Sequence, residues 1–304
     1  MTAWTERLRD AKPLLLDGAT GSELERRGVP CVLPLWSAVA LLQNEYTSVL
    51  RAIHAEYIQR GAQIITANTF RLNRQTLMTE QLHNDSRRLI CKAVDTVREA
   101  IESVARDRTV FIAGSIGPVE DCYHPERAPA DDVLRDDHHR RIDDLYAARP
   151  DLILIETMNN MNEASIATEY AVQTGLPVAV SFIARNDTQL LSGESLEKAI
   201  RRIKTYNPAA LMLNCMHVEI MEHALDVLKD TAGDIPIGAY VNIFPEQSKP
   251  AMTPEDFASR MEAWVSEYKL KIIGGCCGTT PRHIEKLAER IGISKADSWI
   301  DMTV

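Results

Sequence analysis

Three of the six cysteines follow apolar segments and could together ligate a metal ion. Cys215 ends the run 210–215, and Cys276 and Cys277 stand in the sequence GGCCG. Zinc prefers thiolate sulfur, and a catalytic zinc site usually has three protein ligands and one open position. A disulfide between adjacent cysteines strains the backbone, whereas neighbouring glycines let both sulfurs turn toward one ion. The sequence therefore predicts a zinc site on Cys215, Cys276 and Cys277.

Other interpretations of these residues remain open. Unpaired cysteines are common in protein cores, so all three could be inert. His217 could join Cys215 as a ligand, because residues two apart on a strand face the same way. Cys91 has the apolar neighbours of a core position, whereas Cys31 and Cys122 fall in expected loops and are interpreted as incidental. Six cysteines in 304 residues are too few for a disulfide scaffold.

Two acidic and two amide side chains also stand at the ends of apolar runs. Asp17 and Glu156 could act as acid and base, hold magnesium or bind a substrate ammonium group. The thiolates already provide a site for a soft metal, which favours the ammonium interpretation. A capping role for Asp17 and a structural ion pair for Glu156 are the alternatives. Asn68 and Asn242 are candidates for hydrogen bonding to a substrate or for local capping.

Eight short apolar runs, each followed by a segment with helical spacing, must position these side chains. The runs lack strict alternation, as expected for parallel strands that are buried on both faces. The predicted strands are Pro13–Asp17, Gln63–Asn68, Val110–Ser115, Leu152–Thr157, Val178–Ile183, Ala210–Cys215, Ile237–Asn242 and Lys271–Cys276. The predicted helices are Glu45–Arg60, Asp85–Ala105, Asp131–Ala148, Asn162–Thr174, Ser195–Tyr206, Glu219–Asp230, Pro254–Tyr268 and Pro281–Ile291. Eight such units favour one (β/α)8 TIM barrel domain over residues 1–304, because a doubly wound sheet usually has fewer strands.

The carboxyl ends of the strands are where active sites of such barrels lie. Two long stretches without a helical pattern, Ala19–Asn44 and Gly117–Ala130, follow strands and are expected to be irregular loops at that end. His138 and His139 stand in a charged helical segment and are expected on its exposed face.

The overall charge excludes some classes of partner. The formal net charge is −9 and the pI is near 5.5, which argues against a non-specific nucleic-acid surface or an anionic membrane surface. No stretch approaches the roughly 18 apolar residues of a membrane helix, and the N-terminus does not resemble a secretion signal. The expectation is a cytoplasmic globular protein.

Several motifs resemble those of the homocysteine S-methyltransferase family and occur in the same order. They are DGATGSELERRG, GAQIITANTF, AGSIGP, IET, NC and GGCCGTTPRHI, and they span residues 17 to 284. Members of that family are zinc-dependent (β/α)8 barrels that methylate the sulfur of homocysteine, which gives methionine. The resemblance implies zinc ligation by Cys215, Cys276 and Cys277, binding of the substrate ammonium by Asp17 and Glu156, and a substrate carboxylate near the Ser115 segment.

The methyl donor must carry its methyl group on a good leaving group, such as a sulfonium or a quaternary ammonium. S-methylmethionine, S-adenosylmethionine and betaine-like compounds meet this condition. The segment Pro34–Ala38 resembles a loop of the members that use S-methylmethionine. Trp36 in this segment could stack on an onium methyl group, because aromatic faces attract such cations, or it could pack in the rim. The segment Ala239–Pro245 departs from those members, so either substrate could differ from the family norm.

Three thiolate ligands favour delivery of a sulfur nucleophile over generation of hydroxide, for which histidine-rich sites are better suited. The favoured hypothesis is therefore zinc-dependent methyl transfer to homocysteine. A zinc hydrolase or lyase on the same barrel is one alternative. A methyltransferase subunit that takes its methyl group from a separate corrinoid protein, or that uses a different thiol acceptor, is another. The chain could be a monomer or a homodimer.

Overall fold

Eight strands pair in parallel around a ring in the computed structural model, which describes residues 2–243 and 251–293. The strands are β1 (Leu14–Leu15), β2 (Ile64–Ala67), β3 (Phe111–Ile116), β4 (Leu152–Met158), β5 (Val178–Phe182), β6 (Ala210–Asn214), β7 (Ile237–Val241) and β8 (Ile272–Gly275). Their order is β1-β8-β7-β6-β5-β4-β3-β2. A parallel bridge between Leu16 and Ile64 joins the two ends of this order. The structure is a (β/α)8 barrel, and each predicted strand is confirmed to within a few residues.

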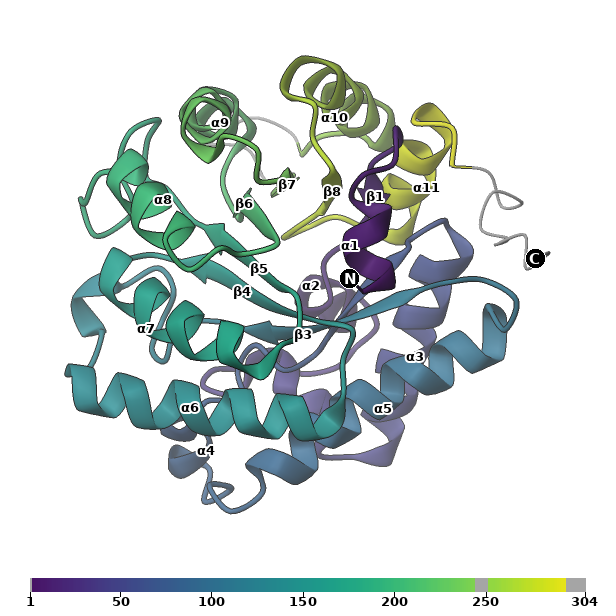
Figure 1. Ribbon diagram of the computed structural model, residues 1–304. Helices are drawn as coiled ribbons and strands as arrows, with labels where there is room; N and C mark the ends of the chain where they lie inside the picture. Colours follow the sequence, from purple (N-terminus) through teal and green to yellow (C-terminus); the bar gives the residue numbers. More distant parts are fainter. Residues whose placement is uncertain (1, 244–250, 294–304) are drawn as a thin grey trace.

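Helices surround the ring of strands (Figure 1). The helices that follow the strands are α3 (Asn44–Gln59), α5 (Ser86–Val104), α6 (Asp131–Ala148), α7 (Met161–Ala171), α8 (Leu196–Lys204), α9 (Val218–Ala232), α10 (Pro254–Tyr268) and α11 (Pro281–Arg290). The shorter elements are α1 (Ala3–Arg7), α2 (Gly21–Arg26), α4 (Arg74–Thr79) and the 3-10 helices η1 (Trp36–Leu41), η2 (Pro125–Arg127) and η3 (Val172–Thr174). The predicted helices are confirmed, whereas the expected irregular stretch Ala19–Asn44 is wrong because it contains α2 and η1.

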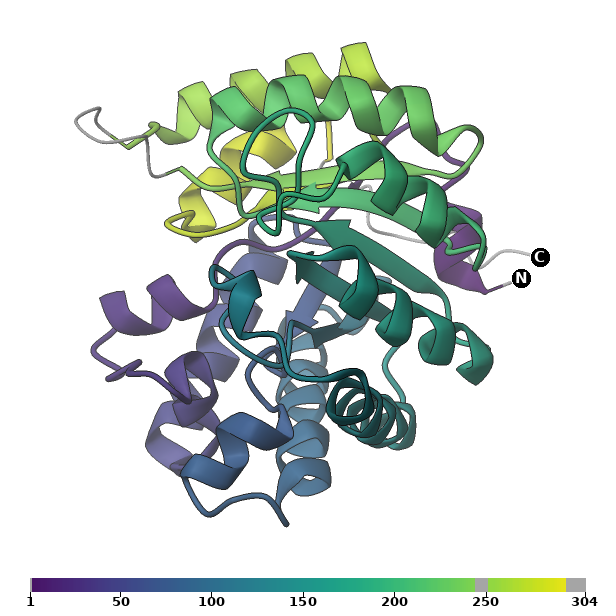
Figure 2. The ribbon, with the colours of Figure 1, turned by 90° about the vertical axis from the view of Figure 1, so that its left-hand side faces the viewer.

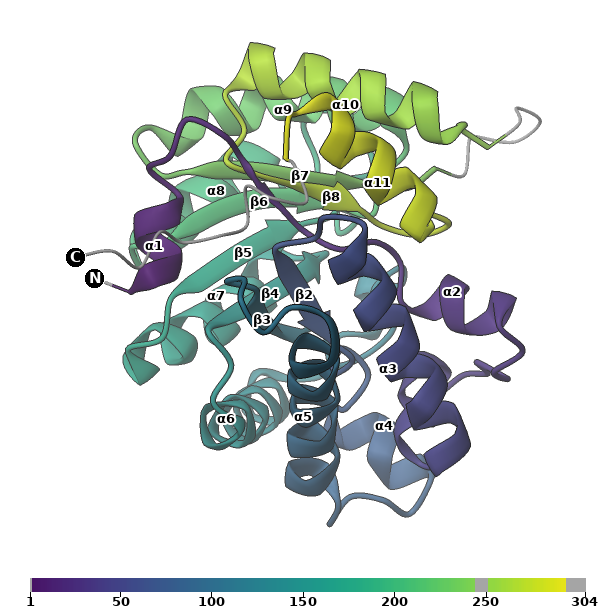
Figure 3. The same cartoon turned by 90° about the vertical axis from the view of Figure 1, so that its right-hand side faces the viewer.

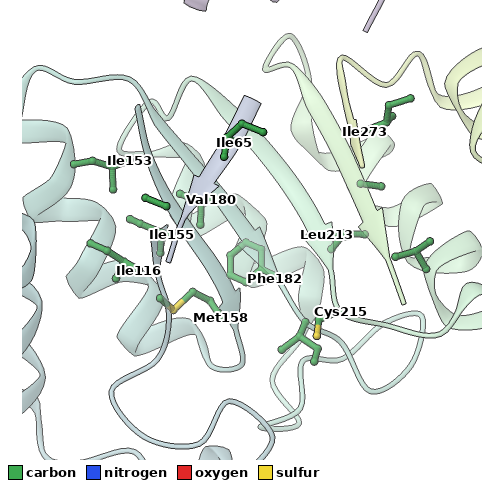
Figure 4. Close-up of a cluster of buried hydrophobic side chains, with 14 of the residues drawn as sticks. Ile65, Ile116, Ile153, Ile155, Met158, Val180, Phe182, Leu213, Cys215 and Ile273 are labelled. Atoms are coloured by element: carbon green, nitrogen blue, oxygen red, sulfur yellow. The ribbon is translucent and has the colours of Figure 1, made fainter. Parts of the chain in front are cut away.

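Alternate residues of the strands build two separate apolar cores. Leu14, Leu152, Leu154 and Ile272 belong to the cluster that fills the barrel. The intervening residues pack outward against the helices, and Figure 4 shows part of this layer, where Ile155, Val180 and Phe182 project from neighbouring strands. Both faces of the sheet are therefore dry, which explains the near-continuous apolar runs.

The two ends of the barrel differ. Trp4 of helix α1 and Leu8, directly after this helix, belong to the inner cluster and close the amino end of the strands. Helix α2 lies at the opposite, carboxyl end, as Figures 2 and 3 show from two sides. Among the described residues, the barrel is therefore filled at its amino end, and a cavity is found at its carboxyl end. No helix of the described residues is long and apolar enough to cross a membrane.

Helix α6 corrects one expectation about exposed residues. His138 is completely buried, and its Nε2 lies 3.0 Å from Oε1 of Glu163 on α7. His139 is partly exposed and stacks on Tyr170 with ring centroids 3.8 Å apart. The charged residues around His138 in the sequence suggested an exposed helix face. The expectation is wrong because some of these charged residues form a buried ionic network with His138.

Candidate active site

A cavity of about 380 Å³ opens at the carboxyl end of the barrel. Its wall combines residues of strand ends with residues of the loops after β1, β2 and β3. All but one of the predicted site residues line it: Asp17, Trp36, Asn68, Ser115, Glu156, Cys215, Cys276 and Cys277. A cavity of this size can hold small polar metabolites.

The three cysteines gather at one side of this cavity. The Sγ atoms of Cys215, Cys276 and Cys277 all lie within 4.8 Å of one another, and those of Cys215 and Cys277 are 3.8 Å apart. Cys215 directly follows β6 and has a φ of 61°, which turns the chain away from the extended course of the strand. Cys276 and Cys277 follow β8, and Gly278 next to them has a φ of 83°, which a glycine adopts without strain. The predicted grouping of these thiols is confirmed as a cluster that could hold a metal ion.

Backbone and side-chain hydrogen bonds hold the cysteine pair in place. The Cys276 amide donates to the carbonyl of Val241 at 2.9 Å. The Cys277 amide donates to Oδ1 of Asn242 at 3.0 Å. Asn242 is not among the described residues that line the cavity. It supports Cys277 from behind, whereas the sequence suggested that it contacts substrate or caps the chain.

The thiols share protons with one another. Hydrogen bonds with Cys215 and Cys276 lower the pKa of Cys277 well below its ordinary value, and hydrogen bonds with Cys215 and Cys277 raise the pKa of Cys276. A cluster of this kind concentrates negative charge on sulfur, which suits a soft cation. His217 lies outside this metal-binding group and is not among the described residues that line the cavity.

Asp17 lies just beyond β1 with both carboxylate oxygens engaged. The amide of Thr66 on β2 donates to Oδ2 at 2.9 Å, and its hydroxyl donates to Oδ1 at 2.9 Å. Burial nevertheless raises the pKa of Asp17 to about 8, and the nearby Glu156 adds to the rise. A second carboxyl group nearby that disfavours ionisation of Asp17 also makes this part of the cavity attractive to a cation.

Glu156 occupies an inward-facing position of β4. Its Oε1 accepts a hydrogen bond from the Ser115 hydroxyl at 2.5 Å, and its Oε2 accepts one from the Tyr240 hydroxyl at 2.8 Å. Burial raises the pKa of Glu156 to about 7, although these two bonds oppose the rise. The Ser115 hydroxyl thus orients Glu156, whereas the family resemblance placed its segment near a substrate carboxylate.

Asn214 connects the metal-binding side of the cavity to Glu156. It directly precedes Cys215, and its Oδ1 accepts a hydrogen bond from the amide of Thr157 at 3.0 Å. Its Nδ2 donates to the Thr157 hydroxyl at 2.8 Å. Thr157 has a φ of 60°, rare for a β-branched residue, where the pairing of β4 with β5 shifts register. This completely buried amide stabilises the bend that follows Glu156.

Loops after β1, β2 and β3 form the outer wall. Trp36 lines the cavity, and its ring packs so close to Gly21 that a Cβ there would lie 2.1 Å from Cζ2. Asn68 binds the loop that carries Trp36: its Oδ1 accepts from the Ser37 hydroxyl at 2.7 Å, and its Nδ2 donates to the Ser37 carbonyl at 2.8 Å. Tyr123 reaches inward, and its hydroxyl lies 3.0 Å from Sγ of Cys215. Asn68 is therefore held by Ser37.

Comparison with known proteins defines the family. The homocysteine S-methyltransferase profile matches residues 14–291. The chain belongs to the homocysteine S-methyltransferase family. Membership makes it a methyltransferase and confirms the resemblance found in the motifs. Similar relatives are homocysteine S-methyltransferase of Escherichia coli, 29% identical over 91% of this chain and 94% of the relative, and selenocysteine Se-methyltransferase of Brassica oleracea var. italica, 26% identical over 91% and 88%.

A solved member of the family has the same fold. The chain is similar to the metallated form of the homocysteine methyltransferase MmuM from Escherichia coli, with a TM-score of 0.78, 27% identity, and coverage of 92% of this chain and 96% of that chain. The likeness extends over nearly the whole of both chains, and the cavity lies at the carboxyl end of the strands, where active sites of (β/α)8 barrels are found.

Proposed function

We propose that this enzyme transfers a methyl group from an onium donor to the thiolate of homocysteine, which gives methionine. The observation that carries the proposal is the convergence of three thiols and two buried carboxyls on one cavity. Homocysteine has one thiol and one ammonium group, and these two groups match the two clusters. The names of the similar relatives in Escherichia coli and Zea mays support the same acceptor.

We infer that Zn²⁺ is the metal held by Cys215, Cys276 and Cys277. Tetrahedral zinc with Zn–S bonds of about 2.3 Å places its sulfur ligands roughly 3.8 Å apart. The Sγ atoms of Cys215 and Cys277 lie 3.8 Å apart. The cluster contains sulfur ligands alone, which soft or borderline ions prefer. Bound there, Zn²⁺ would supply the positive charge that keeps a substrate thiol deprotonated at neutral pH.

Asp17 and Glu156 bind the ammonium group of homocysteine in this proposal. Their pKa values, about 8 and about 7, leave the empty pair partly protonated at neutral pH. An ammonium group between them favours the ionised form of both carboxyls. The pair therefore recognises a cation and orients the amino acid so that its thiol points toward the cysteines.

The reaction itself is a direct displacement. The thiol proton of homocysteine passes to solvent, and the sulfur lone pair forms a bond to the methyl carbon of the donor. The bond from that carbon to the onium atom breaks, and its electron pair stays on the leaving sulfur or nitrogen. The onium atom loses its positive charge when it leaves, and the released thiol proton carries that charge to solvent, so atoms and charges balance. Positioning of the two substrates in line supplies most of the rate enhancement.

Product analysis tests the reaction. Purified protein with zinc and homocysteine is offered S-methylmethionine, S-adenosylmethionine and betaine in separate assays, and methionine is measured. We expect methionine from at least one donor. Methionine from none of them would exclude the proposed function and would favour a corrinoid-protein donor or a different thiol.

Metal analysis tests the ligand set. Cys276→Ser is expected to lose the one zinc ion per chain that the wild type binds, because two thiolates hold the ion much less tightly than three. Cys91→Ser is the matched control, since Cys91 lies on α5 outside the cluster. Unchanged zinc content in Cys276→Ser would contradict the assignment.

A further inference from the structure

Arg71 brings a positive charge into the cavity that the chemistry above does not use. Among the described residues that line the cavity it is the one basic side chain, and the acidic ones are Asp17, Asp121 and Glu156. The wall of a site for a cationic donor has no obvious use for a guanidinium group, because like charges repel. Arg71 therefore needs an anionic partner.

The position of Arg71 is at the outer part of the cavity. It stands in the loop after β2, and its guanidinium carbon lies 5.7 Å from the ring centroid of Phe70. Burial raises the pKa of Cys122 to about 12, and the charge of Arg71 opposes this rise. The guanidinium is thus close to Cys122, in the loop after β3 that also carries Tyr123. The Tyr123 hydroxyl lies 3.0 Å from Sγ of Cys215, so this loop connects the surroundings of Arg71 to the cysteine cluster.

The hydrogen-bonding capacity of Arg71 is not exhausted within the protein. Its Nε is buried and has no hydrogen-bond partner among the described residues. The neighbouring Arg74, in contrast, pairs with Asp136 at 2.7 Å. A charged group without a partner is costly, and Arg71 forms no ion pair with a carboxylate of the described residues. A ligand carboxylate in the cavity that Arg71 lines would supply the missing counter-charge through a charge-assisted hydrogen bond.

We propose that Arg71 binds the carboxylate of the methyl donor, so that the donor is an onium compound with a carboxylate group. This inference rests on the proposed methyl transfer to homocysteine. A donor without a carboxylate would bring an uncompensated cation beside Arg71, whereas a zwitterionic donor brings its own counter-charge. The aromatic residues Trp36, Phe70 and Tyr123 of the same wall offer faces to the onium methyl groups.

The carboxylate of homocysteine is the competing ligand for Arg71. In homocysteine the carboxylate and the ammonium group share one carbon, so the carboxylate must stay near Asp17 and Glu156. The oxygens of Asp17 accept from Thr66, and those of Glu156 accept from the Ser115 and Tyr240 hydroxyls, so neither carboxyl is paired with Arg71. The guanidinium is thus associated with the outer loops, away from the ammonium site, which favours the donor.

Steady-state kinetics of Arg71→Met, Arg71→Lys and the control Arg74→Met test the proposal. Three donors are compared with the zinc-loaded enzymes: S-methylmethionine, betaine and trimethylsulfonium, which has no carboxylate. Arg71→Met is expected to raise KM for the carboxylate donor by roughly 10- to 100-fold, the range of a lost charge-assisted hydrogen bond. KM for homocysteine stays within about twofold of the wild type, because homocysteine does not use Arg71. KM for trimethylsulfonium does not rise and is expected to fall, because the replaced guanidinium repelled its charge. Arg71→Lys is intermediate, and Arg74→Met behaves as the wild type.

The outcomes separate the alternatives. If Arg71→Met raises KM for S-methylmethionine, the donor is an amino-acid sulfonium. If it raises KM for betaine, the donor is a simple ammonium carboxylate. An equal rise for trimethylsulfonium, or a rise confined to homocysteine, overturns the proposal. If the wild type methylates homocysteine with none of the donors, the proposed function fails. Calorimetric titration of S-methylmethionine and betaine into the homocysteine-loaded proteins then decides on Arg71 alone. Weaker binding by Arg71→Met than by the wild type supports the inference, and equal or absent binding overturns it.

Discussion

Glu156 shows how single residues tune the site. Burial raises its pKa to about 7, and the hydroxyls of Ser115 and Tyr240 restrain the rise because they donate to the ionised carboxylate. The carboxyl group is thus poised to ionise close to neutral pH. In the proposed function, both hydroxyls influence substrate binding through Glu156.

Removal of the Tyr240 hydroxyl is expected to weaken homocysteine binding at neutral pH. In Tyr240→Phe, Oε2 of Glu156 loses its donor, so the pKa of Glu156 rises further and more of the enzyme is protonated at pH 7. The acid limb of kcat/KM for homocysteine moves to higher pH by about one unit, and KM at pH 7 increases. The pH profile of kcat/KM, measured for the wild type and for Tyr240→Phe, gives the shift.

Tyr146→Phe is the matched control for this prediction, because Tyr146 is 54% exposed and far from the barrel interior. Its pH profile is expected to follow the wild type. An unshifted acid limb in Tyr240→Phe would show that the hydroxyl does not restrain Glu156.

The residues proposed to form the site stand out in the sequence, but the residues that support them do not. Cysteine pairs and carboxylates after apolar runs stand out by their type. Thr66, Tyr240 and Asn214 act through hydrogen bonds to Asp17, Glu156 and Thr157, which are 49, 84 and 57 positions away. Their types alone, threonine, tyrosine and asparagine, fit many roles. Such partners become evident only when the register of the strands is known.

Helices α6 and α7 clamp the loops that form the outer wall. Oε1 of Glu163 accepts from the Val119 amide at 2.7 Å, and Nη2 of Arg141 donates to the Gly117 carbonyl at 2.9 Å. Oδ2 of Asp137 accepts from the Arg74 amide at 2.6 Å. The loops after β2 and β3, with Arg71 and Tyr123, are therefore anchored by one buried network.

Glu163→Ala is expected to destabilise the fold strongly. Glu163 is 1% exposed, and its removal leaves His138 and the Val119 amide without their buried acceptor. Loss of one member of a buried ionic network lowers the free energy of unfolding by roughly 3–5 kcal/mol. Urea unfolding measures the change, with Glu169→Ala as the control. Glu169 is exposed, and the effect of its replacement is expected within about 0.5 kcal/mol. Equal stabilities of the two variants would contradict the clamp.

Long elements were predictable because their pattern is repeated. Helix α10 begins at Pro254, after Thr253 whose side chain accepts from the Asp256 amide, and the sequence contains this start signal in full. Helix α2 has six residues, too few for a periodic pattern, so it was taken for a loop. The exposure of His138 was predicted wrongly, because residue types do not show whether a charged side chain is solvated or buried in an ion pair.

At the scale of the whole molecule, the barrel separates stability from function. The inner cluster with Trp4 and Leu8 closes one end, and the polar inward positions Thr66, Ser115 and Glu156 open the other. Eight parallel strands made this division predictable, because their carboxyl ends meet at one rim. The choice of donor was not predictable in the same way, since it depends on loops whose contacts do not follow a period.

The buried carboxyls at the carboxyl end of the barrel lower the stability of the fold in a way that depends on pH. Burial raises the pKa of Asp17 from 3.8 to about 8 and that of Glu156 from 4.5 to about 7. Between about pH 5 and 8 the folded protein therefore binds more protons than the unfolded chain, so each rise in pH favours unfolding. The loss is at most about 1.4 kcal/mol per pH unit for each carboxyl.

The free energy of unfolding of the homocysteine-free enzyme is thus expected to fall from about pH 5 to 8, and replacement of both carboxyls with amides is expected to flatten this dependence. In the double variant Asp17→Asn, Glu156→Gln, neither group titrates, so stability at pH 8 exceeds that of the wild type although homocysteine binding is lost. Urea unfolding at several pH values, with equal zinc loading of both proteins, measures the two slopes. Equal slopes would show that the ammonium site does not carry the cost, whereas a flatter slope in the variant identifies substrate recognition as a source of instability in the empty barrel.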